Sequence, residues 1–171
     1  IEKIALEIFD CMKKVHGLGR RQRLLLRISA ILHDCGKYIS MVNLGECSYN
    51  IIISTEIIGL SHMEREMVAS IVRYNTMELP NFNEFDGKLG NDEYLIVMKL
   101  AAILRVCNAL DRSHRQKFAD MKLTIKDSNI VITTAYPDNI TLEKKTLKDK
   151  QDFFEEVYGL GFEIKQKKKK Q

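Results

Sequence analysis

The spacing of apolar residues along the first 117 positions predicts a series of amphipathic helices. Hydrophobic side chains recur every three or four positions, which is the period of a helix with one buried face. Glycines and capping residues divide this pattern into separate elements. The expected helices cover residues 1–16, 20–34, 46–58, 61–72 and 91–114, and a polar loop covers residues 80–90.

After Lys117 the apolar pattern changes from a helical period to strict alternation. Residues 121–125 and 130–134 alternate on either side of Asp127-Ser128-Asn129, which is turn material, so they predict a β-hairpin. A charged helix from Thr141 to Gly159 and a short strand over residues 160–165 follow. The predicted fold class is mainly α. It combines a helical domain over residues 1–117, a small ββαβ α+β module over residues 118–165, and a basic disordered tail over residues 166–171.

Composition narrows the functional classes only slightly. The chain has 171 residues with a net charge of +4, but Lys165 to Lys170 supply five of the lysines. Without this tail the charge balance is close to neutral, so bulk charge gives no indication of DNA binding. No apolar run reaches 18 residues, so the sequence predicts no membrane span.

The cysteines indicate the cellular compartment of the protein, and the first residues indicate whether the chain is complete. The four cysteines form no CxxC pair, which favours free thiols in a reducing compartment, and we expect a cytoplasmic protein. Ile1 already lies inside a helical pattern and is not a methionine. We therefore expect the chain to be part of a longer protein.

An adjacent histidine and aspartate close the second predicted helix, in the segment Leu32-His33-Asp34-Cys35-Gly36-Lys37. An imidazole and a carboxylate at a helix end can both reach one divalent metal ion. Two ligands are too few, however, because catalytic metal sites need at least three from the protein. The rest of the chain therefore has to decide whether this pair is functional.

Four segments occur in a characteristic order: VHGLG at 15–19, LHDCGK at 32–37, VRY at 72–74 and AILRVCNALDRSH at 102–114. Together they resemble the C-terminal HD-like domain of the exopolyphosphatase / guanosine pentaphosphate phosphohydrolase (Ppx/GppA) family. The resemblance implies an HD-type helical bundle with a small end module. It also implies an accessory role, in which the domain helps to bind a long anionic substrate and supports a homodimer.

The resemblance further implies that hydrolysis takes place elsewhere. In this family the phosphatase site lies in N-terminal actin-like domains, which would precede Ile1 and for which we expect Mg²⁺. We therefore expect no catalytic residue and no cofactor in this chain. Polyphosphate and guanosine pentaphosphate are both open as the substrate of the parent protein.

The metal-ligand pattern of HD proteins, followed residue by residue, implies a degenerate site. His33 and Asp34 match its central pair, but Cys47, Asn75 and Asn108 stand where the pattern has ligands or histidines. Amides bring no negative charge and bind divalent cations far less well than carboxylates. Asp111, three residues after Asn108, could stand in only in part. We expect no functional metal, with His33 and Asp34 acting as buried polar groups that have hydrogen-bond partners.

Basic residues supply the candidate binding site. Arg105, Arg112 and Arg115 are expected on the long helix and just beyond it, within a sector of about 80°. The resemblance places Lys37 and Arg73 near that face. Guanidinium forks and ammonium groups suit a repeating phosphate chain. The predicted polyanion-binding set is Lys37, Arg73, Arg105, Arg112 and Arg115. The alternative is that these are solvated surface residues paired with Asp111 or Glu64.

Three functions remain open on the sequence. The favoured one is a binding and assembly domain of a polyphosphate or guanosine pentaphosphate phosphohydrolase. The second is a stand-alone, metal-dependent HD phosphohydrolase with an unusual site. The third is a purely structural dimerisation module that has lost anion binding.

Overall fold

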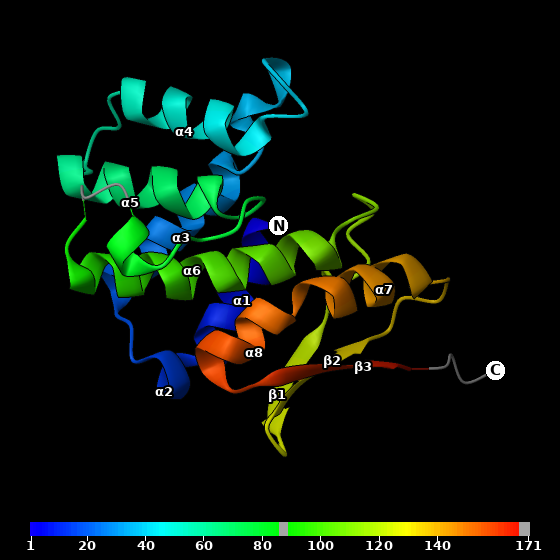
Figure 1. Cartoon of the computed structure of the whole chain (residues 1–171). Helices are drawn as coiled ribbons and strands as arrows, with labels where there is room; N and C mark the ends of the chain where they lie inside the picture. Colours follow the sequence, from blue (N-terminus) through cyan, green and yellow to red (C-terminus); the bar gives the residue numbers. More distant parts are fainter. Residues whose placement is uncertain (86–88, 168–171) are drawn as a thin grey trace. The chain divides into compact units, whose positions relative to one another are not determined.

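The computed structural model describes residues 1–85 and 89–167 (Figure 1). Over these residues the chain is mainly helical, with eight α-helices and a small three-stranded mixed sheet, so the predicted fold class is confirmed. The elements follow in this order: α1 (Glu2–Cys11), α2 (Lys13–His16), α3 (Arg20–Leu32), the 3₁₀ turn η1 (Cys35–Tyr38), α4 (Leu44–Ser54), α5 (His62–Arg73), the 3₁₀ turn η2 (Phe82–Glu84), α6 (Asn91–Leu110), β1 (Lys122–Lys126), β2 (Asn129–Thr134), α7 (Thr141–Lys150), α8 (Asp152–Tyr158) and β3 (Gly161–Gln166).

The chain divides into two compact units. Residues 18–104 form the first, here called the helical unit, and residues 1–17 together with 105–171 form the second, here called the sheet unit. Helix α6 contributes its residues up to Leu104 to the helical unit and the rest to the sheet unit. That residues 1–117 and 118–165 form separate domains stays a prediction.

In the helical unit, α3 and α5 pack side by side and run parallel. Arg21, in the first turn of α3, donates to both carboxylate oxygens of Glu64 in the first turn of α5, at 2.5 and 2.7 Å. The two helices therefore begin together, and they have 13 and 12 residues.

Helix α4 runs antiparallel to α5. Glu46, in the first turn of α4, accepts from Arg73 at the end of α5, and the Tyr49 hydroxyl donates to Glu66 in its middle. The turn η1 packs closely against α4, because Gly36 donates from its N–H to the Ser48 hydroxyl at 3.0 Å. A Cβ at Gly36 would lie 2.5 Å from the backbone nitrogen of Ser48, so only glycine permits this approach.

The start of α5 confirms the predicted capping box. The Ser61 hydroxyl accepts from the N–H of Glu64 at 3.2 Å, and the Glu64 carboxylate accepts from the N–H of Ser61 at 2.8 Å. Behind this cap the apolar face of α5 is fully buried. The core of the helical unit includes Leu25, Leu26, Ala30, Ile52, Met67, Val68, Ile71, Val72, Val97, Leu100 and Leu104.

The sheet unit contains the predicted hairpin. Strands β1 and β2 are antiparallel, with Lys126 opposite Asn129 and a two-residue turn between them. Both turn residues, Asp127 and Ser128, have positive φ, at 48° and 59°, which is the signature of a type I′ turn. On its other side β2 pairs with β3 in parallel, with Asn129 opposite Gly161. A parallel pair needs a crossover connection, which α7 and α8 provide.

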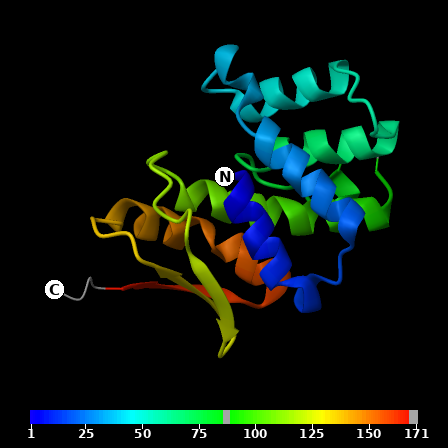
Figure 2. The same ribbon diagram turned by 180° about the vertical axis from the view of Figure 1, so that it is seen from behind.

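The helix predicted from Thr141 to Gly159 is divided in two. Helix α7 ends at Lys150 and α8 begins at Asp152, with Gln151 between them. Helix α8 is held against the sheet by Phe154, which is fully buried and whose ring lies 4.7 Å from that of Phe162 in β3. Helix α1 lies beside β1, as Figure 2 shows.

Two sequence-based expectations extend beyond the described residues. Strand β3 continues through Gln166, the first residue of the predicted tail, whereas residues 168–171 are not described. The predicted loop over residues 80–90 contains η2, and residues 86–88 of it lie outside the described ranges. Within residues 1–85 and 89–167, no helix is long and apolar enough to cross a membrane.

We predict that the pair of Arg21 and Glu64 gives the protein a measurable acid-sensitive stability. The hydrogen bond from Arg21, with the backbone bond from Ser61, lowers the pKa of Glu64 from 4.5 to about 2. Because the pKa is lower in the folded state, the stabilisation is fully present above pH 4.5 and is lost as the pH falls towards 2. Glu64→Gln should lower the Tm at pH 7 by about 1 to 3 °C, in line with an exposed ion pair.

Thermal unfolding followed by circular dichroism at pH 7, 4 and 3 checks this prediction. The difference in Tm between wild type and Glu64→Gln should narrow below pH 4.5, because Glu64 then gains a proton in the unfolded chain before it does so in the folded protein. A difference that stays constant down to pH 3 would contradict it.

Candidate polyanion-binding site

His33 and Asp34 lie where α3 ends, beside the first turn of α4. His33 Nδ1 lies 2.8 Å from the carbonyl oxygen of Ala30, and since a carbonyl only accepts, Nδ1 carries the proton. His33 Nε2 lies 3.5 Å from Asp34 Oδ1. Nε2 is buried and has no hydrogen-bond partner in the part of the chain that the structure describes. The backbone bond fixes the tautomer and the orientation of the ring.

The two basic residues of the predicted set in the helical unit are both engaged. Lys37 Nζ lies 3.7 Å from Asp34 Oδ2. Arg73 donates from Nε and Nη2 to Glu46, each at 2.7 Å, and its guanidinium lies over the rings of Tyr49 and Tyr74. An arginine held by a carboxylate and two rings joins the end of α5 to the start of α4. Its part in binding a polyanion stays a prediction.

Among the described residues, no cluster of three candidate metal ligands includes His33 and Asp34. No group of three or more His, Cys, Asp or Glu that could hold a metal occurs among residues 1–85 and 89–167. Asn75 is only 4% exposed, and neither atom of its amide has a hydrogen-bond partner in the described chain. His33, Asp34 and this amide amount to one imidazole, one carboxylate and one neutral group. They do not match the donor set of a catalytic transition-metal site.

We predict that the purified chain carries no stoichiometric transition metal. His33 and Asp34 supply only two strong ligands, and elemental analysis of protein prepared without chelators measures the outcome directly. About one Mn, Fe or Zn per chain, lost in His33→Ala, would contradict the prediction. The matched control is His62→Ala, because His62 is an exposed histidine at the start of α5.

The other three predicted arginines belong to the sheet unit, and the structure distributes them differently from the expected helix face. Helix α6 ends at Leu110, so only Arg105 lies on it. The guanidinium of Arg105 lies over the ring of Phe153, 4.3 Å from its centroid. Arg112 and Arg115 come from the segment that follows the helix. The expectation that Arg105, Arg112 and Arg115 share one sector of about 80° on a helix is therefore wrong, because α6 ends before Arg112 and Arg115.

Residues 111–117 form a compact loop, here called the 111–117 loop. Its first turn is closed by the N–H of His114, which donates to the carbonyl of Asp111 at 2.9 Å. The N–H of Gln116 then donates to the Asp111 carboxylate at 3.1 Å. Arg112, His114 and Arg115 are exposed. Arg112 and Arg115 have no hydrogen-bond or ion-pair partner among the residues that the structure describes, which distinguishes them from Arg73 and Arg105.

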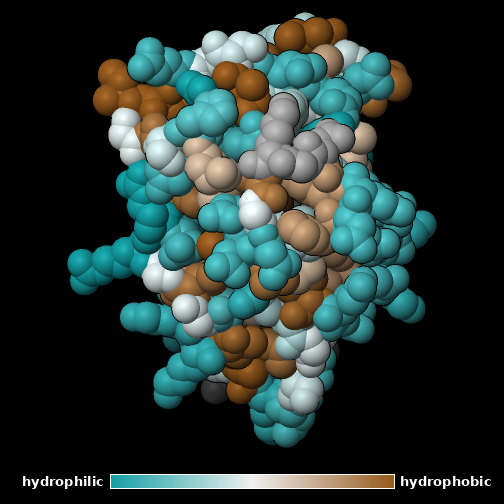
Figure 3. Space-filling view, turned by 60° about the vertical axis from the view of Figure 1, so that its left-hand side comes forward, coloured by the Kyte–Doolittle hydropathy of each residue, from teal (hydrophilic) through white to brown (hydrophobic). Residues whose placement is uncertain are grey.

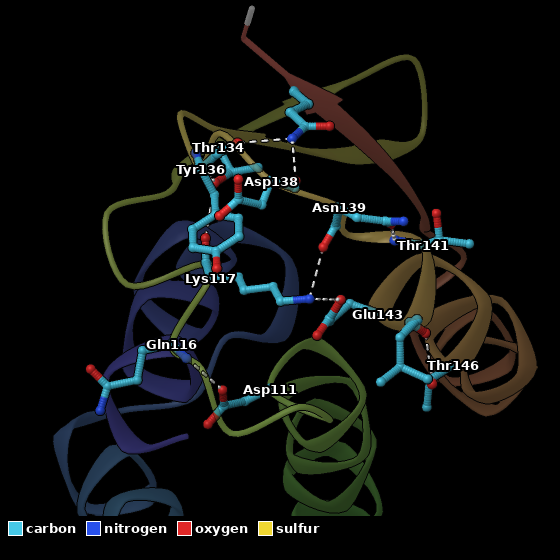
Figure 4. A network of polar contacts seen from close by, with 12 residues as sticks. Asp111, Gln116, Lys117, Thr134, Tyr136, Asp138, Asn139, Thr141, Glu143 and Thr146 are labelled. Atoms are coloured by element: carbon cyan, nitrogen blue, oxygen red, sulfur yellow. Dashed lines mark hydrogen bonds and ion pairs between the residues drawn. The ribbon is translucent and has the colours of Figure 1, made fainter. Parts of the chain in front are cut away.

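The far end of the loop is held by Lys117, as Figure 4 shows. The ammonium of Lys117 donates to Glu143 Oε2 in α7 at 3.0 Å and to the carbonyl of Asn139 at 2.8 Å. Its backbone carbonyl accepts from the hydroxyl of Thr134, at the end of β2, at 3.0 Å. The side chains of Lys117 and Glu143 are 9% and 0% exposed. One lysine therefore links the loop to β2, to α7 and to the segment between them.

The electrostatic surroundings keep Glu143 charged although it is buried. Burial by itself raises the pKa of this carboxyl group. The nearby hydroxyl of Ser113 and the ammonium of Lys117 lower it by more, so the pKa of Glu143 lies below its ordinary value of 4.5. The pair is therefore a buried ammonium and carboxylate, and each compensates the charge of the other.

Exposed apolar side chains elsewhere do not form a comparable site. Tyr38, Val42 and Ile58 are almost fully exposed in the helical unit, at 99%, 93% and 98%. Figure 3 shows one face of the molecule, on which hydrophobic and hydrophilic side chains are mixed and the hydrophobic ones gather in separate groups. Nothing in this arrangement defines a groove or an occupant.

Sequence reasoning identified Arg112 and Arg115 but missed the residues that hold them. Glu143 lies 26 positions after Lys117, in a helix rich in charged residues, and no local pattern connects the two. The one signal in the sequence was the position of Glu143 between Ile140 and Leu147, both of which are buried. A charged residue three or four positions from such neighbours lies on the buried face of its helix.

Comparison with protein families agrees with this architecture. Residues 1–152 match the family described as Ppx/GppA phosphatase, domain III. The chain belongs to this family, and the resemblance seen in its sequence is confirmed. A search of curated proteins finds no match.

Proposed function

We propose that this chain is an accessory domain of a Ppx/GppA phosphatase that binds the phosphate chain of polyphosphate, while hydrolysis takes place in other domains of the parent protein. Family membership supports the accessory role, because the match is to domain III of the phosphatase. The proposal includes the N-terminal actin-like domains as partners and a homodimer as the assembled form, both implied by the family resemblance. Guanosine pentaphosphate is the alternative ligand.

The observation that supports polyanion binding most strongly is that Arg112 and Arg115 are exposed and are paired with no carboxylate among the described residues. Both guanidinium groups are exposed on one short loop, within a chain segment closed by hydrogen bonds from His114 and Gln116 to Asp111. Neither is neutralised by a carboxylate in the described structure. Guanidinium forks bind phosphate oxygens with two parallel hydrogen bonds, and a linear polyphosphate offers such oxygens at every unit.

The other three residues of the predicted set are secondary in this proposal. Lys37 already faces Asp34, Arg73 is bound by Glu46, and Arg105 lies over Phe153. Binding a polyanion through them would exchange an existing interaction for a new one, so each would add less affinity. We therefore rank Arg112 and Arg115 first.

We predict that Arg112→Gln/Arg115→Gln weakens binding of a polyphosphate of defined length by about tenfold at low salt, because two charge-assisted contacts are lost. The slope of log Kd against log salt should fall by about 1.5, because binding with two fewer phosphate contacts releases fewer counterions. Titration calorimetry at several salt concentrations measures both quantities.

Two controls make this test specific. Lys144→Gln/Lys145→Gln removes two exposed positive charges from α7 of the same unit, and removal of residues 168–171 takes away three lysines. Both should change the affinity less than the arginine variant does. If either control abolishes binding while the arginine variant binds normally, the site assignment is wrong.

We also predict that the isolated chain hydrolyses neither polyphosphate nor guanosine pentaphosphate. The described residues offer no group of three side chains that could hold a catalytic metal ion. Release of phosphate with added Mg²⁺ or Mn²⁺ is the measurement. Activity that disappears in His33→Ala would favour a stand-alone HD phosphohydrolase instead.

A further inference from the structure

We propose that Asp111 and the buried pair of Lys117 and Glu143 are positioning residues, which hold the 111–117 loop in one conformation so that Arg112 and Arg115 engage the same phosphate chain together. This inference rests on the proposed function, because it concerns how that site is built. It assigns a role to two acidic residues and one lysine that would themselves not touch the ligand.

The backbone of the loop shows that it has to be held. His114 and Gln116 have φ angles of 53° and 52°, in the left-handed region that residues other than glycine rarely adopt. Two such residues in a seven-residue segment raise the free energy of this conformation relative to more relaxed ones. The conformation therefore depends on contacts that fix it from both ends.

Asp111 supplies the contact at the first end. Its side chain is buried, and its carboxylate accepts from the N–H of Gln116, one of the two left-handed residues. Its backbone carbonyl accepts from the N–H of His114, the other left-handed residue. Both strained positions are thus bonded to Asp111, and Arg112 and Arg115 lie inside the segment that these bonds close.

Lys117 supplies the contact at the second end, as Figure 4 shows. Its ammonium is bound by Glu143 and the carbonyl of Asn139, and its own carbonyl is bound by Thr134. Because the carboxylate of Glu143 is fully buried, moving Lys117 away would leave an unpaired charge in the interior. The loop therefore cannot rearrange at this end without breaking the pair.

A loop fixed in this way binds a polyanion more tightly than a mobile one. Ordering a flexible segment on binding costs conformational entropy, and a segment that is already ordered avoids this cost. A mobile loop would also tend to bring one arginine to the ligand at a time. Both the affinity and the number of phosphate contacts should therefore depend on Asp111 and on the contacts that hold Lys117, which include the bond from Thr134.

Charge provides a way to distinguish positioning from a direct electrostatic effect. Asp111 and Glu143 are acidic, so by charge alone their presence opposes the binding of an anion. Removing the negative charge of Asp111 should strengthen binding if only long-range electrostatics matters. It should weaken binding if the carboxylate holds the loop.

The test compares Asp111→Ala with Asp111→Asn, using polyphosphate of defined length and the full 171-residue chain. Both variants lose the same charge, but Asn keeps an oxygen that can accept from Gln116. We expect Asp111→Ala to bind at least threefold more weakly, with a salt slope lower by about one because one arginine no longer engages. Asp111→Asn should restore binding to within twofold of wild type.

Thr134→Val is a second variant that leaves every charge in place. It removes the bond that the Thr134 hydroxyl donates to the carbonyl of Lys117, together with the bond that this hydroxyl accepts from the N–H of Tyr136. It should also weaken binding and lower the salt slope, and it decides the question if Asp111→Ala does not fold. Asp120→Ala removes an exposed acidic charge from the same unit and should leave the slope unchanged.

The outcomes separate the inference from the proposed function. If Arg112→Gln/Arg115→Gln weakens binding but Asp111→Ala and Thr134→Val bind with the affinity and slope of wild type, the positioning role is wrong and the site stands. Tighter binding by Asp111→Ala would also overturn the positioning role. If the arginine variant itself binds normally, the proposed function fails.

Discussion

The buried ion pair of Lys117 and Glu143 is the constraint on which the candidate site depends. An ammonium 9% exposed and a carboxylate 0% exposed cannot be separated without leaving a charge in the interior. The pair therefore fixes where the chain passes after α6, relative to β2 and α7 of the same unit. Arg112 and Arg115 lie just before this fixed point, and both are exposed.

Arginines play a different role in the helical unit than Arg112 and Arg115 do in the sheet unit. Arg21 and Arg73 are each bound by a carboxylate on a neighbouring helix, and Arg73 also lies over two tyrosine rings. These arginines join α3 to α5 and α5 to α4. A count of basic residues would treat them as equal to Arg112 and Arg115, whereas their partners show which positive charges are available to a ligand.

Much of this architecture could be predicted from the sequence because it depends on local signals. The period of apolar residues located the helices, Ser61 and Glu64 predicted the cap of α5, and the two-residue turn marked the hairpin. The end of α6 was predicted about four residues too late. The residues after Leu110 are compatible with a longer helix, but the structure ends α6 there. The loop that follows is closed by a bond from Gln116 to Asp111, and no pattern in the sequence predicts this bond.

The candidate site was predictable only in part, for a similar reason. The arginines were visible as residues, but their state depends on partners that are far away in the sequence. Phe153, which lies under Arg105, and Glu143, which binds Lys117, are separated from them by 48 and 26 positions. Such pairs are determined by the packing of α7 and α8 on the sheet, and no pattern within a short window contains them.

The most direct test of the central claim is a nuclear magnetic resonance titration of the isotope-labelled chain with a short polyphosphate of defined length. If the phosphate chain binds to guanidinium groups held on the 111–117 loop, the largest chemical-shift changes will fall on the amides of residues 112–116 and on the Nε–H groups of Arg112 and Arg115. Shifts confined to residues 165–171, or to the exposed apolar segment of residues 38–42, would contradict it.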